Sequence, residues 1–228
     1  GKHVLLEKPM AQTNAQAKKL SDAVKKSGKT FMVAHQYVYN DHINYVKALH
    51  QKKLFGKIIS VKAEHLYNQP RKDIGCFWDA GTHQLAVIQY MFNPGKISTI
   101  SGSAKSASGN FFDDNTEVSL KFENGLQSKL FLSSVSQNKS RKFIFEGEKI
   151  TAAFDDSKKP LLKIAQGGSS AKKISIPAKE PLKNELEHFI RCIHTNETPK
   201  TGIAESMIVT GWLAQISKKL KIRTKNKK

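Results

Sequence analysis

The chain has 228 residues, of which 39% are hydrophobic and 25% are charged, a composition typical of a globular protein with one sizeable core. No apolar run approaches the roughly 18 residues that a membrane span needs, and the sequence contains no secretory signal. The two cysteines, Cys76 and Cys192, have no metal-type spacing, which argues against a disulfide framework and favours a reducing, cytoplasmic location.

The net charge of +19 comes almost entirely from lysine, because the chain has only four arginines: Arg71, Arg141, Arg191 and Arg223. Arginine is the residue that reads base edges and stacks on bases, and the lysines are spread over the whole chain. We therefore expect a solvated, lysine-rich surface and rank a nucleic-acid partner, with its steep salt dependence, last. The dense cluster at 218–228 is expected to be a frayed, soluble end.

The first 35 residues predict a strand, a helix and a second strand. The apolar run 4–7 is the first strand; Thr13 followed by Gln16 is a capping-box pattern, Gly28 is suited to end the helix, and 30–34 is the second strand. Such a βαβ unit requires a parallel sheet, and two strands alone do not make a stable one. Because the chain also opens inside an apolar run, we expect residues to precede it.

The next elements are a helix that Asn40 or Asp41 caps, running to about Leu54, a strand at 57–66, a loop at 67–77 and a helix at 79–92. Seven short strand candidates then follow one another, with Asn124-Gly125 as a strong hairpin signal. They are 97–103, 116–122, 126–134, 142–146, 150–154, 161–164 and 172–176. Helices at 181–194 and 203–220 close the chain.

This order predicts an α/β part followed by an α+β part. Residues 1–37 are interpreted as the end of a doubly wound parallel sheet, and 38–228 as a domain built on a mostly antiparallel open sheet with flanking helices. A nucleotide-binding domain followed by an antiparallel-sheet domain is a common layout of two-part dehydrogenases.

Three segments carry side chains suited to chemistry. Glu7-Lys8-Pro9 follows the first strand and His35-Gln36-Tyr37 the second, so both should face the crevice beyond the carboxyl ends of the strands, where ligands bind in open α/β sheets. Asp79 and His83 are four residues apart, so both can reach one substrate from one helical face as a carboxylate and a proton acceptor. The plainer alternatives are a charged strand end, a polar loop start and a helix that Asp79 caps.

Other chemistry finds little support. The remaining histidines form no ligand triad, so no metal site is predicted. No serine or cysteine sits in a nucleophile elbow, and no GxGxxG phosphate-binding loop occurs anywhere in the sequence.

Together these segments resemble the Gfo/Idh/MocA family of oxidoreductases. Residues 1–11 are similar to its signature GKHVxxEKPxA, and Asp79-Ala80-Gly81-Thr82-His83 matches its DxGxH helix start. The strand at 29–36, the helix-to-strand turn at 55–58 and the closing segment at 199–220 also resemble the family, in the same order along the chain.

The resemblance implies an NAD- or NADP-dependent oxidoreductase that acts on sugars, inositols or similar hydroxy compounds, with 1–37 as the remainder of a Rossmann domain that lacks its main phosphate-binding loop. It places Lys8 near the nicotinamide and the reacting hydroxyl, His83 as the acceptor of the hydroxyl proton, and Asp79 as a group that holds the substrate and orients the histidine. It also implies cofactor contacts for the residues that follow the first and second strands, and substrate contacts for Trp78 as well as Lys8, Asp79 and His83. The cofactor set is Glu7, Lys8, Pro9, His35 and Gln36.

The sequence departs from the family at Tyr37-Val38-Tyr39, where many members carry an arginine, so an anion-binding role at that place is in doubt. The alternative function is a non-catalytic binding or dimerisation module without a cofactor site. In either case we expect a small-molecule substrate or ligand, no membrane partner and a homo-oligomer formed through the antiparallel sheet.

Overall fold

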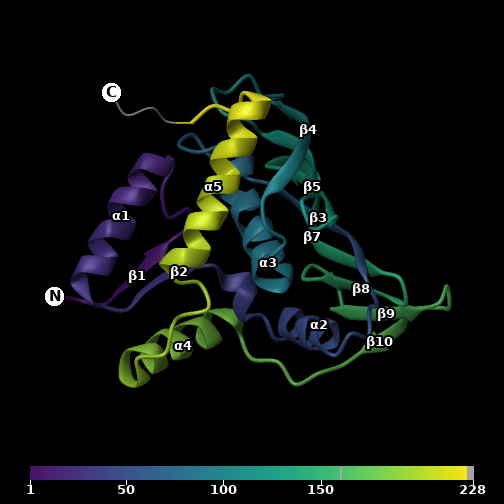
Figure 1. The fold of residues 1–228 in the computed structure, drawn as a ribbon. Helices are drawn as coiled ribbons and strands as arrows, with labels where there is room; N and C mark the ends of the chain where they lie inside the picture. Colours follow the sequence, from purple (N-terminus) through teal and green to yellow (C-terminus); the bar gives the residue numbers. More distant parts are fainter. Residues whose placement is uncertain (160, 225–228) are drawn as a thin grey trace.

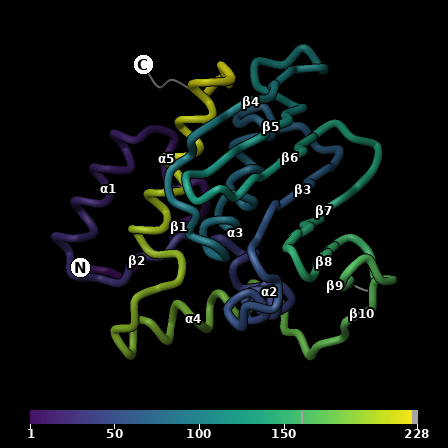
Figure 2. Tube along the Cα trace, turned by 45° about the vertical axis from the view of Figure 1, so that its right-hand side comes forward, coloured from purple at the N-terminus to yellow at the C-terminus, as the bar shows by residue number. Residues whose placement is uncertain are grey.

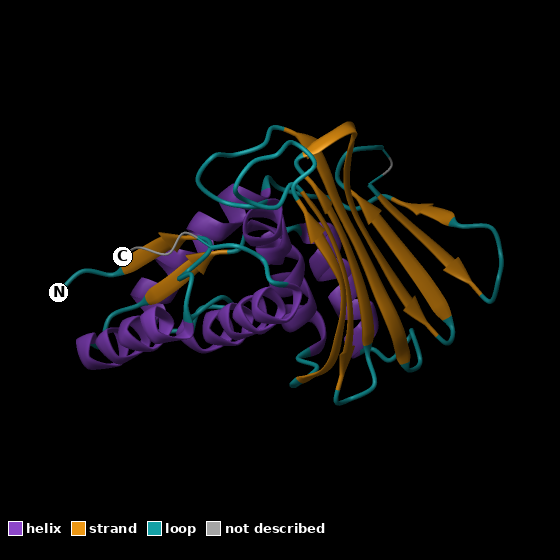
Figure 3. Cartoon of the chain, turned by 90° about the horizontal axis from the view of Figure 1, so that it is seen from above, coloured by secondary structure: helices purple, strands orange, loops and turns teal. Residues whose placement is uncertain are grey.

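The computed structural model describes residues 1–159 and 161–224. A small parallel sheet with its helix lies on one side of the molecule and a large, twisted sheet on the other, with further helices between them (Figure 1). Seen from above, the helices gather on one face of the large sheet (Figure 3).

The predicted βαβ unit is confirmed. β1 (Val4–Glu7) and β2 (Phe31–Ala34) are parallel, and α1 (Asn14–Ser27) connects them. The Thr13 hydroxyl accepts a hydrogen bond from the Gln16 amide at 3.1 Å, while the Gln16 side chain accepts from the backbone of the residue before the cap. This is a variant of the predicted capping box that satisfies two amides at the helix start.

The second helix, α2 (Asp41–Gln51), begins as expected but ends three residues earlier than predicted. A short 3-10 helix, η1 (Gln36–Tyr39), precedes it where a polar loop was expected. Asn40 is the cap, since its side-chain oxygen accepts from the backbone amides of the first turn. The helix stops early because Phe55 is fully buried and the turn that brings it inward has a positive φ at Lys53.

The large sheet has eight strands in the order β10-β9-β8-β7-β3-β6-β5-β4. Their bounds are β3 (Ile58–Asn68), β4 (Ile97–Lys105), β5 (Asn115–Phe122), β6 (Gln127–Ser133), β7 (Val135–Gly147), β8 (Ile150–Asp155), β9 (Leu162–Gln166) and β10 (Lys172–Ile174). The hairpin at Asn124-Gly125 is confirmed between β5 and β6, with Gly125 at a φ of 88°.

The predicted, mostly antiparallel sheet is confirmed, but at its centre the strands do not follow one another in chain order. β3 lies between β6 and β7 and pairs parallel with β6 but antiparallel with β7. The strand can take this place because it alternates buried residues such as Val61 and Ala63 with polar ones, so one face packs against the helices. The sheet is therefore mostly, not wholly, antiparallel.

The helix expected at 79–92 begins earlier and irregularly. A π-helical turn, η2 (Phe77–Gly81), leads into α3 (Thr82–Phe92), and the residue before it is Cys76. Asp79 therefore lies inside the turn, with its amide donating to Gly75, and does not cap the helix. π-Turns of this kind are frequent at functional sites.

The last helix ties the two parts of the chain together. α4 (Pro181–Thr195) and α5 (Ile203–Leu220) close the described chain, and α5 packs on both α1 and α3 (Figure 2). Just before α5, the Thr201 carbonyl accepts from the Val33 amide of β2 at 2.9 Å. The basic end is less frayed than expected, because α5 includes Lys218 and Lys219 and Ile222 is buried; 225–228 lie outside the described residues.

The buried cap of α2 offers a test of this framework. Replacing Asn40 with alanine removes the acceptor for two amides, and we expect the free energy of unfolding to fall by about 1 kcal/mol, whereas Asn40→Asp keeps an acceptor and should retain most of it. Urea denaturation measures both variants; equal stability of Asn40→Ala and the parent chain would contradict the cap.

Candidate active site

Lys8 joins the end of β1 to the π-turn. Its ammonium group donates to the carboxylate Oδ1 of Asp79 and to the same residue's backbone carbonyl, both at 2.8 Å. The two side chains are only 15% and 20% exposed, so the pair is far better shielded from solvent than a surface salt bridge. The Lys8–Pro9 peptide bond is cis.

The other carboxylate oxygen of Asp79 accepts from the Tyr67 hydroxyl at 3.0 Å, and the Arg71 guanidinium lies 3.8 Å from Oδ1. Burial by itself would raise the pKa of Asp79, but the charge of Lys8 and the hydrogen bonds from Lys8 and Tyr67 outweigh it, and the pKa is lowered. The carboxylate is therefore ionised at neutral pH.

His83 follows one turn later on α3 and is half-buried. The edge of the Tyr37 ring meets it at a centroid distance of 5.4 Å, and the His65 ring stacks near it at 6.3 Å. Its Nδ1 is buried without a hydrogen-bond partner. Burial, followed by the charge of Lys8, lowers the pKa of His83 well below its usual value, so the imidazole is neutral and holds a free lone pair.

Two further histidines close in on the same ammonium group. His35 is 3% exposed, and burial and then Lys8 lower its pKa to about 3. Burial and the charge of Arg141 bring the pKa of His65 to about 4. The charge of Lys8 thus acts on three neutral imidazoles, while Lys8 itself is paired with the ionised carboxylate of Asp79.

Arg141 stands opposite His65 in the β3–β7 register and so shares its face of the sheet. Its Nη1 lies 3.6 Å from the carboxylate of Asp156, to which the Tyr37 hydroxyl also donates at 3.4 Å, while its Nε is buried without a partner. Arg141 therefore supplies a cation close to Tyr37, where the sequence lacks the arginine that many family members carry.

The structure brings together the predicted catalytic residues Lys8, Asp79 and His83, which come from β1, η2 and α3. Of the predicted cofactor residues, His35 is buried and lies near Lys8. Pro9 and Gln36 are half-buried at the strand ends, and Glu7 is exposed.

The substrate-contact role predicted for Trp78 is not supported. Its side chain is 1% exposed, and its indole N–H donates to the Ser217 hydroxyl of α5 at 2.9 Å. The residue therefore belongs to the packing between the π-turn and the last helix and leaves almost no surface for a substrate.

Sequence reasoning missed Tyr67, His65 and Arg141. The alternation of β3 carried a signal for two of them, because His65 and Tyr67 continue the face that Val61 and Ala63 bury. Arg141 had no such signal, since it reaches the site only through the pairing of β7 with β3.

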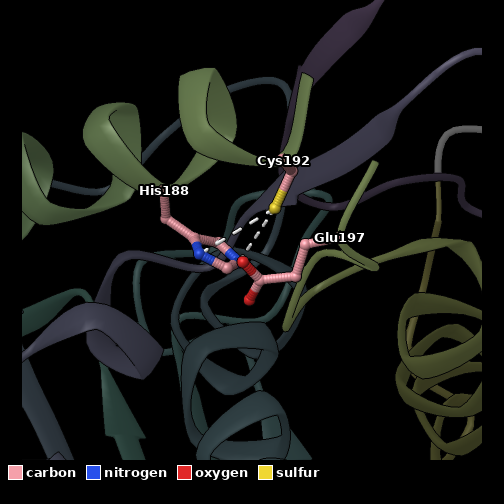
Figure 4. A group of neighbouring side chains, drawn as sticks. All are labelled: His188, Cys192 and Glu197. Atoms are coloured by element: carbon pink, nitrogen blue, oxygen red, sulfur yellow. Dashed lines mark hydrogen bonds between the residues drawn. The ribbon is translucent and has the colours of Figure 1, made fainter. Parts of the chain in front are cut away.

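In the described part of the chain, one group of side chains, His188, Cys192 and Glu197, lies close enough together to hold a metal ion (Figure 4). The ligand atoms are already engaged: the Lys200 amide donates to Nε2 of His188 at 3.1 Å, and Nη2 of Arg191 lies 2.7 Å from Nδ1. Arg191 also pairs with Glu197 at 3.0 Å, and burial raises the pKa of Cys192. These contacts hold the loop after α4 in place, and the side chains are not free to bind a metal ion.

Comparison with models of protein families shows to which family the chain belongs. Residues 1–35 match the model of the oxidoreductase family with an NAD-binding Rossmann fold, and residues 43–153 match the model of the GFO/IDH/MocA C-terminal domain. The two models describe consecutive parts of one family and together match more than half of the chain. The chain belongs to the Gfo/Idh/MocA family of oxidoreductases.

Two relatives in sequence carry names of dehydrogenases. A levoglucosan dehydrogenase from Pseudarthrobacter phenanthrenivorans is 30% identical over 40% of this chain and 27% of its own length. A 1-carboxy-3-chloro-3,4-dihydroxycyclohexa-1,5-diene dehydrogenase from Comamonas testosteroni is 23% identical over 61% of this chain and 38% of its own length. The chain thus spans well under half of either relative.

Several solved oxidoreductase structures share the fold. An inositol dehydrogenase homolog from Azotobacter vinelandii, in complex with NAD⁺, superimposes with a TM-score of 0.86 at 16% identity, covering 95% of this chain and 70% of that one. An aldose-aldose oxidoreductase from Caulobacter crescentus gives 0.85 at 18% identity, with 96% and 70% covered. A UDP-N-acetylglucosamine 3-dehydrogenase from Acidithiobacillus ferrooxidans gives 0.84 at 18%, with 95% and 70% covered.

Among the described helices, none is both long enough and apolar enough to cross a membrane.

The buried histidines should make the fold sensitive to mild acid. Because the pKa values of His35 and His65 fall from 6.5 to about 3 and 4 on folding, the unfolded chain binds more protons below pH 6.5. The free energy of unfolding should therefore decrease as the pH is lowered below 6.5, by up to about 1.4 kcal/mol per pH unit for each histidine. Glu185 opposes this trend, since burial raises its pKa to about 7 and its contribution is lost as pH rises through that value.

Urea denaturation between about pH 7 and pH 5 measures the slope. His65→Gln should flatten it and Glu185→Gln should steepen it, whereas the exposed His194→Gln should leave it unchanged. A stability that does not decline below pH 6.5 in the Glu185→Gln chain would contradict the neutral state of these histidines.

Proposed function

We propose that this protein acts as an NAD- or NADP-dependent dehydrogenase or reductase on the hydroxyl group of a sugar, an inositol or a similar compound. The observation that carries the proposal is the meeting of Lys8, Asp79 and His83 just beyond the carboxyl end of β1. The names of the relatives, which include dehydrogenases of an anhydrosugar and of a cyclic diol, support the same reaction class.

The residues at the strand ends fit the nicotinamide end of such a cofactor. Lys8 supplies a cation, Gln36 an amide and His83 a buried Nδ1 without a partner, and His35 lies close to Lys8. The given sequence contains no glycine-rich loop for the pyrophosphate, so these residues would hold only one end of the dinucleotide. When bound, the cofactor supplies the hydride acceptor or donor.

Lys8 is placed to stabilise negative charge on a substrate oxygen. An ammonium group has three N–H donors, and the contacts with Asp79 use two of them, which leaves the third for a hydroxyl or alkoxide oxygen. The site is partly desolvated, so the interaction with a developing alkoxide is stronger there than in water.

His83 is suited to receive the hydroxyl proton because it is neutral and keeps an unshared lone pair. Asp79 is ionised and held from two sides by Lys8 and Tyr67, so it can accept a hydrogen bond from a neighbouring substrate hydroxyl without moving. The three residues thus divide the work into charge stabilisation, proton acceptance and substrate positioning.

The proposal makes a direct kinetic prediction for a chain that also carries a phosphate-binding loop ahead of residue 1. Lys8→Met and His83→Gln should each lower turnover by at least about 100-fold, the usual contribution of a positioned acid–base group, with much smaller changes in cofactor affinity. Lys2→Met and His194→Gln change exposed residues of the same types and serve as controls. Unchanged turnover in either test variant would remove that residue from the mechanism.

The 228-residue chain itself should bind the cofactor poorly, because it has no glycine-rich loop at a helix start to hold the pyrophosphate. Titration with NADH and NADPH, followed by cofactor fluorescence, should give dissociation constants above the micromolar range. Sub-micromolar binding to this chain would show that another part of it replaces the loop.

We propose, further, that the open face of the large sheet forms a homo-oligomer and that the boundary between the two parts of the chain lies near residue 37. The first rests on the described helices, which lie on one face of the large sheet (Figure 3). The second rests on the end of β2 at Ala34.

A further inference from the structure

A cleft lies apart from the Lys8–Asp79 pair, between α2, the end of α3 and the start of α5. Its volume is about 400 Å³. The side chains that matter for its chemistry are Lys47, Gln89, Tyr90, Lys200, Glu205 and His35. No residue of the proposed catalytic set lines it, although His35 stands between this cleft and Lys8.

Two lysines approach the same aromatic ring of the lining. The ammonium of Lys47 lies 3.3 Å from the ring centroid of Tyr90 and donates to the carbonyl of that residue at 2.8 Å. The ammonium of Lys200 lies 5.9 Å from the same ring and 5.8 Å from that of Tyr39. Among the described residues, neither lysine forms a salt bridge with a carboxylate.

The fold holds Lys200 at the rim of the cleft. Its backbone amide donates to Nε2 of His188 at 3.1 Å, and Arg191 contacts both His188 and Glu197 of the same cluster. The His188 cluster in Figure 4 therefore has a positioning function: it fixes the loop that carries this lysine.

The lining also contains buried polar atoms that lack partners. These are Oε1 of Gln89, Nδ1 of His35 and Oε2 of Glu205. Gln89 is 7% exposed and His35 3%, so bulk solvent does not satisfy them. Buried polar atoms normally have hydrogen-bond partners, and a hydroxyl group can supply a donor to Gln89 and either a donor or an acceptor to His35.

The electrostatics of the lining favour a negative guest near the lysines. Burial, and then the charge of Lys200, lower the pKa of Lys47 to about 8. Lys200 is exposed at the rim; desolvation and the neighbouring Arg191 lower its pKa, and the charges of Glu197 and Asp41 only partly offset this. Glu205 is the one acidic residue of the lining, and it does not feature among the charges that act on either lysine. An anion between the lysines would relieve their mutual repulsion.

We propose that this cleft binds a small hydroxylated anion, with its phosphate or carboxylate group between Lys47 and Lys200 and its hydroxyls toward Gln89 and His35. The ligand class is that of sugar phosphates and sugar acids. This inference does not depend on the proposed function, because the cleft, the lysine pair and the unpartnered atoms lie outside the Lys8–Asp79–His83 group. A ligand in the cleft would contact His35, which in turn lies near Lys8.

The test titrates the 228-residue chain with inorganic phosphate, gluconate and the neutral polyol glucitol at constant ionic strength, and follows the lysine ε-CH₂ signals by NMR. Phosphate, gluconate or both should bind saturably and shift the signals of Lys47 and Lys200, and glucitol should not. Whichever anion binds identifies the anionic group that the cleft prefers. Saturable binding of neither anion, or equal binding of glucitol, would overturn the proposal.

Variants then locate the binding. Lys47→Met and Lys200→Met should each weaken it about tenfold or more, the effect of losing one charged hydrogen bond, whereas Lys52→Met on the exposed end of α2 should change it less than about twofold. Because Lys47 also bonds to the backbone of α3, thermal unfolding without ligand checks that each variant is folded, and Lys200→Met keeps the test valid if Lys47→Met is not. Equal weakening by Lys52→Met, or none by Lys200→Met, would contradict the assigned site.

Discussion

The contact between Lys8 and Asp79 fixes the small parallel sheet relative to the π-turn that leads into α3. One ammonium group bridges a carboxylate and a backbone carbonyl of the same turn, so it fixes both the side chain and the path of the main chain. A largely buried ion pair is stable only when its remaining hydrogen-bonding capacity is used, and here Tyr67 takes the second carboxylate oxygen. The small parallel sheet and the helix that carries His83 are thereby held in one geometry.

The charge of Lys8 also sets the state of its surroundings. A partly desolvated cation disfavours a second positive charge nearby, which is one reason why His35 and His83 stay neutral in the folded chain. A proton acceptor and a cation can thus stand in one small space, which a hydride-transfer reaction at a hydroxyl group requires. The same arrangement lowers stability in acid, so the electrostatics that suit the proposed chemistry limit the pH range in which the fold is stable.

Much of the fold could be predicted from the sequence, and so could the three residues that meet in the candidate site. Helix and strand positions follow from local signals such as the cap at Thr13 and the turn at Asn124-Gly125. Lys8, Asp79 and His83 were recognised because they lie in short motifs. The insertion of β3 between β6 and β7 was not predictable in the same way, because a strand's alternation shows which face is buried but not which strands flank it.

Side chains that depend on long-range pairing escaped prediction for the same reason. Arg141 joins the site through its register with His65, and no local pattern contains that register. Trp78 was assigned a substrate contact because it lies in the loop before Asp79, whereas the π-turn places its indole against Ser217 of α5. An extra residue in a helical turn changes the direction of every side chain after it, and residue spacing alone does not reveal such an insertion.

The central place of β3 has a consequence for how the molecule is assembled. The strand is synthesised well before β6 and β7, so it cannot be enclosed by both neighbours until the chain has been made as far as Gly147. Pairing over such separations requires large loops to close before any contact rewards them, which makes folding slow relative to that of a sheet built from successive hairpins. Both edges of β3 are open until β6 has been made, and one edge stays open until β7 is complete, which exposes the nascent chain to aggregation in that interval.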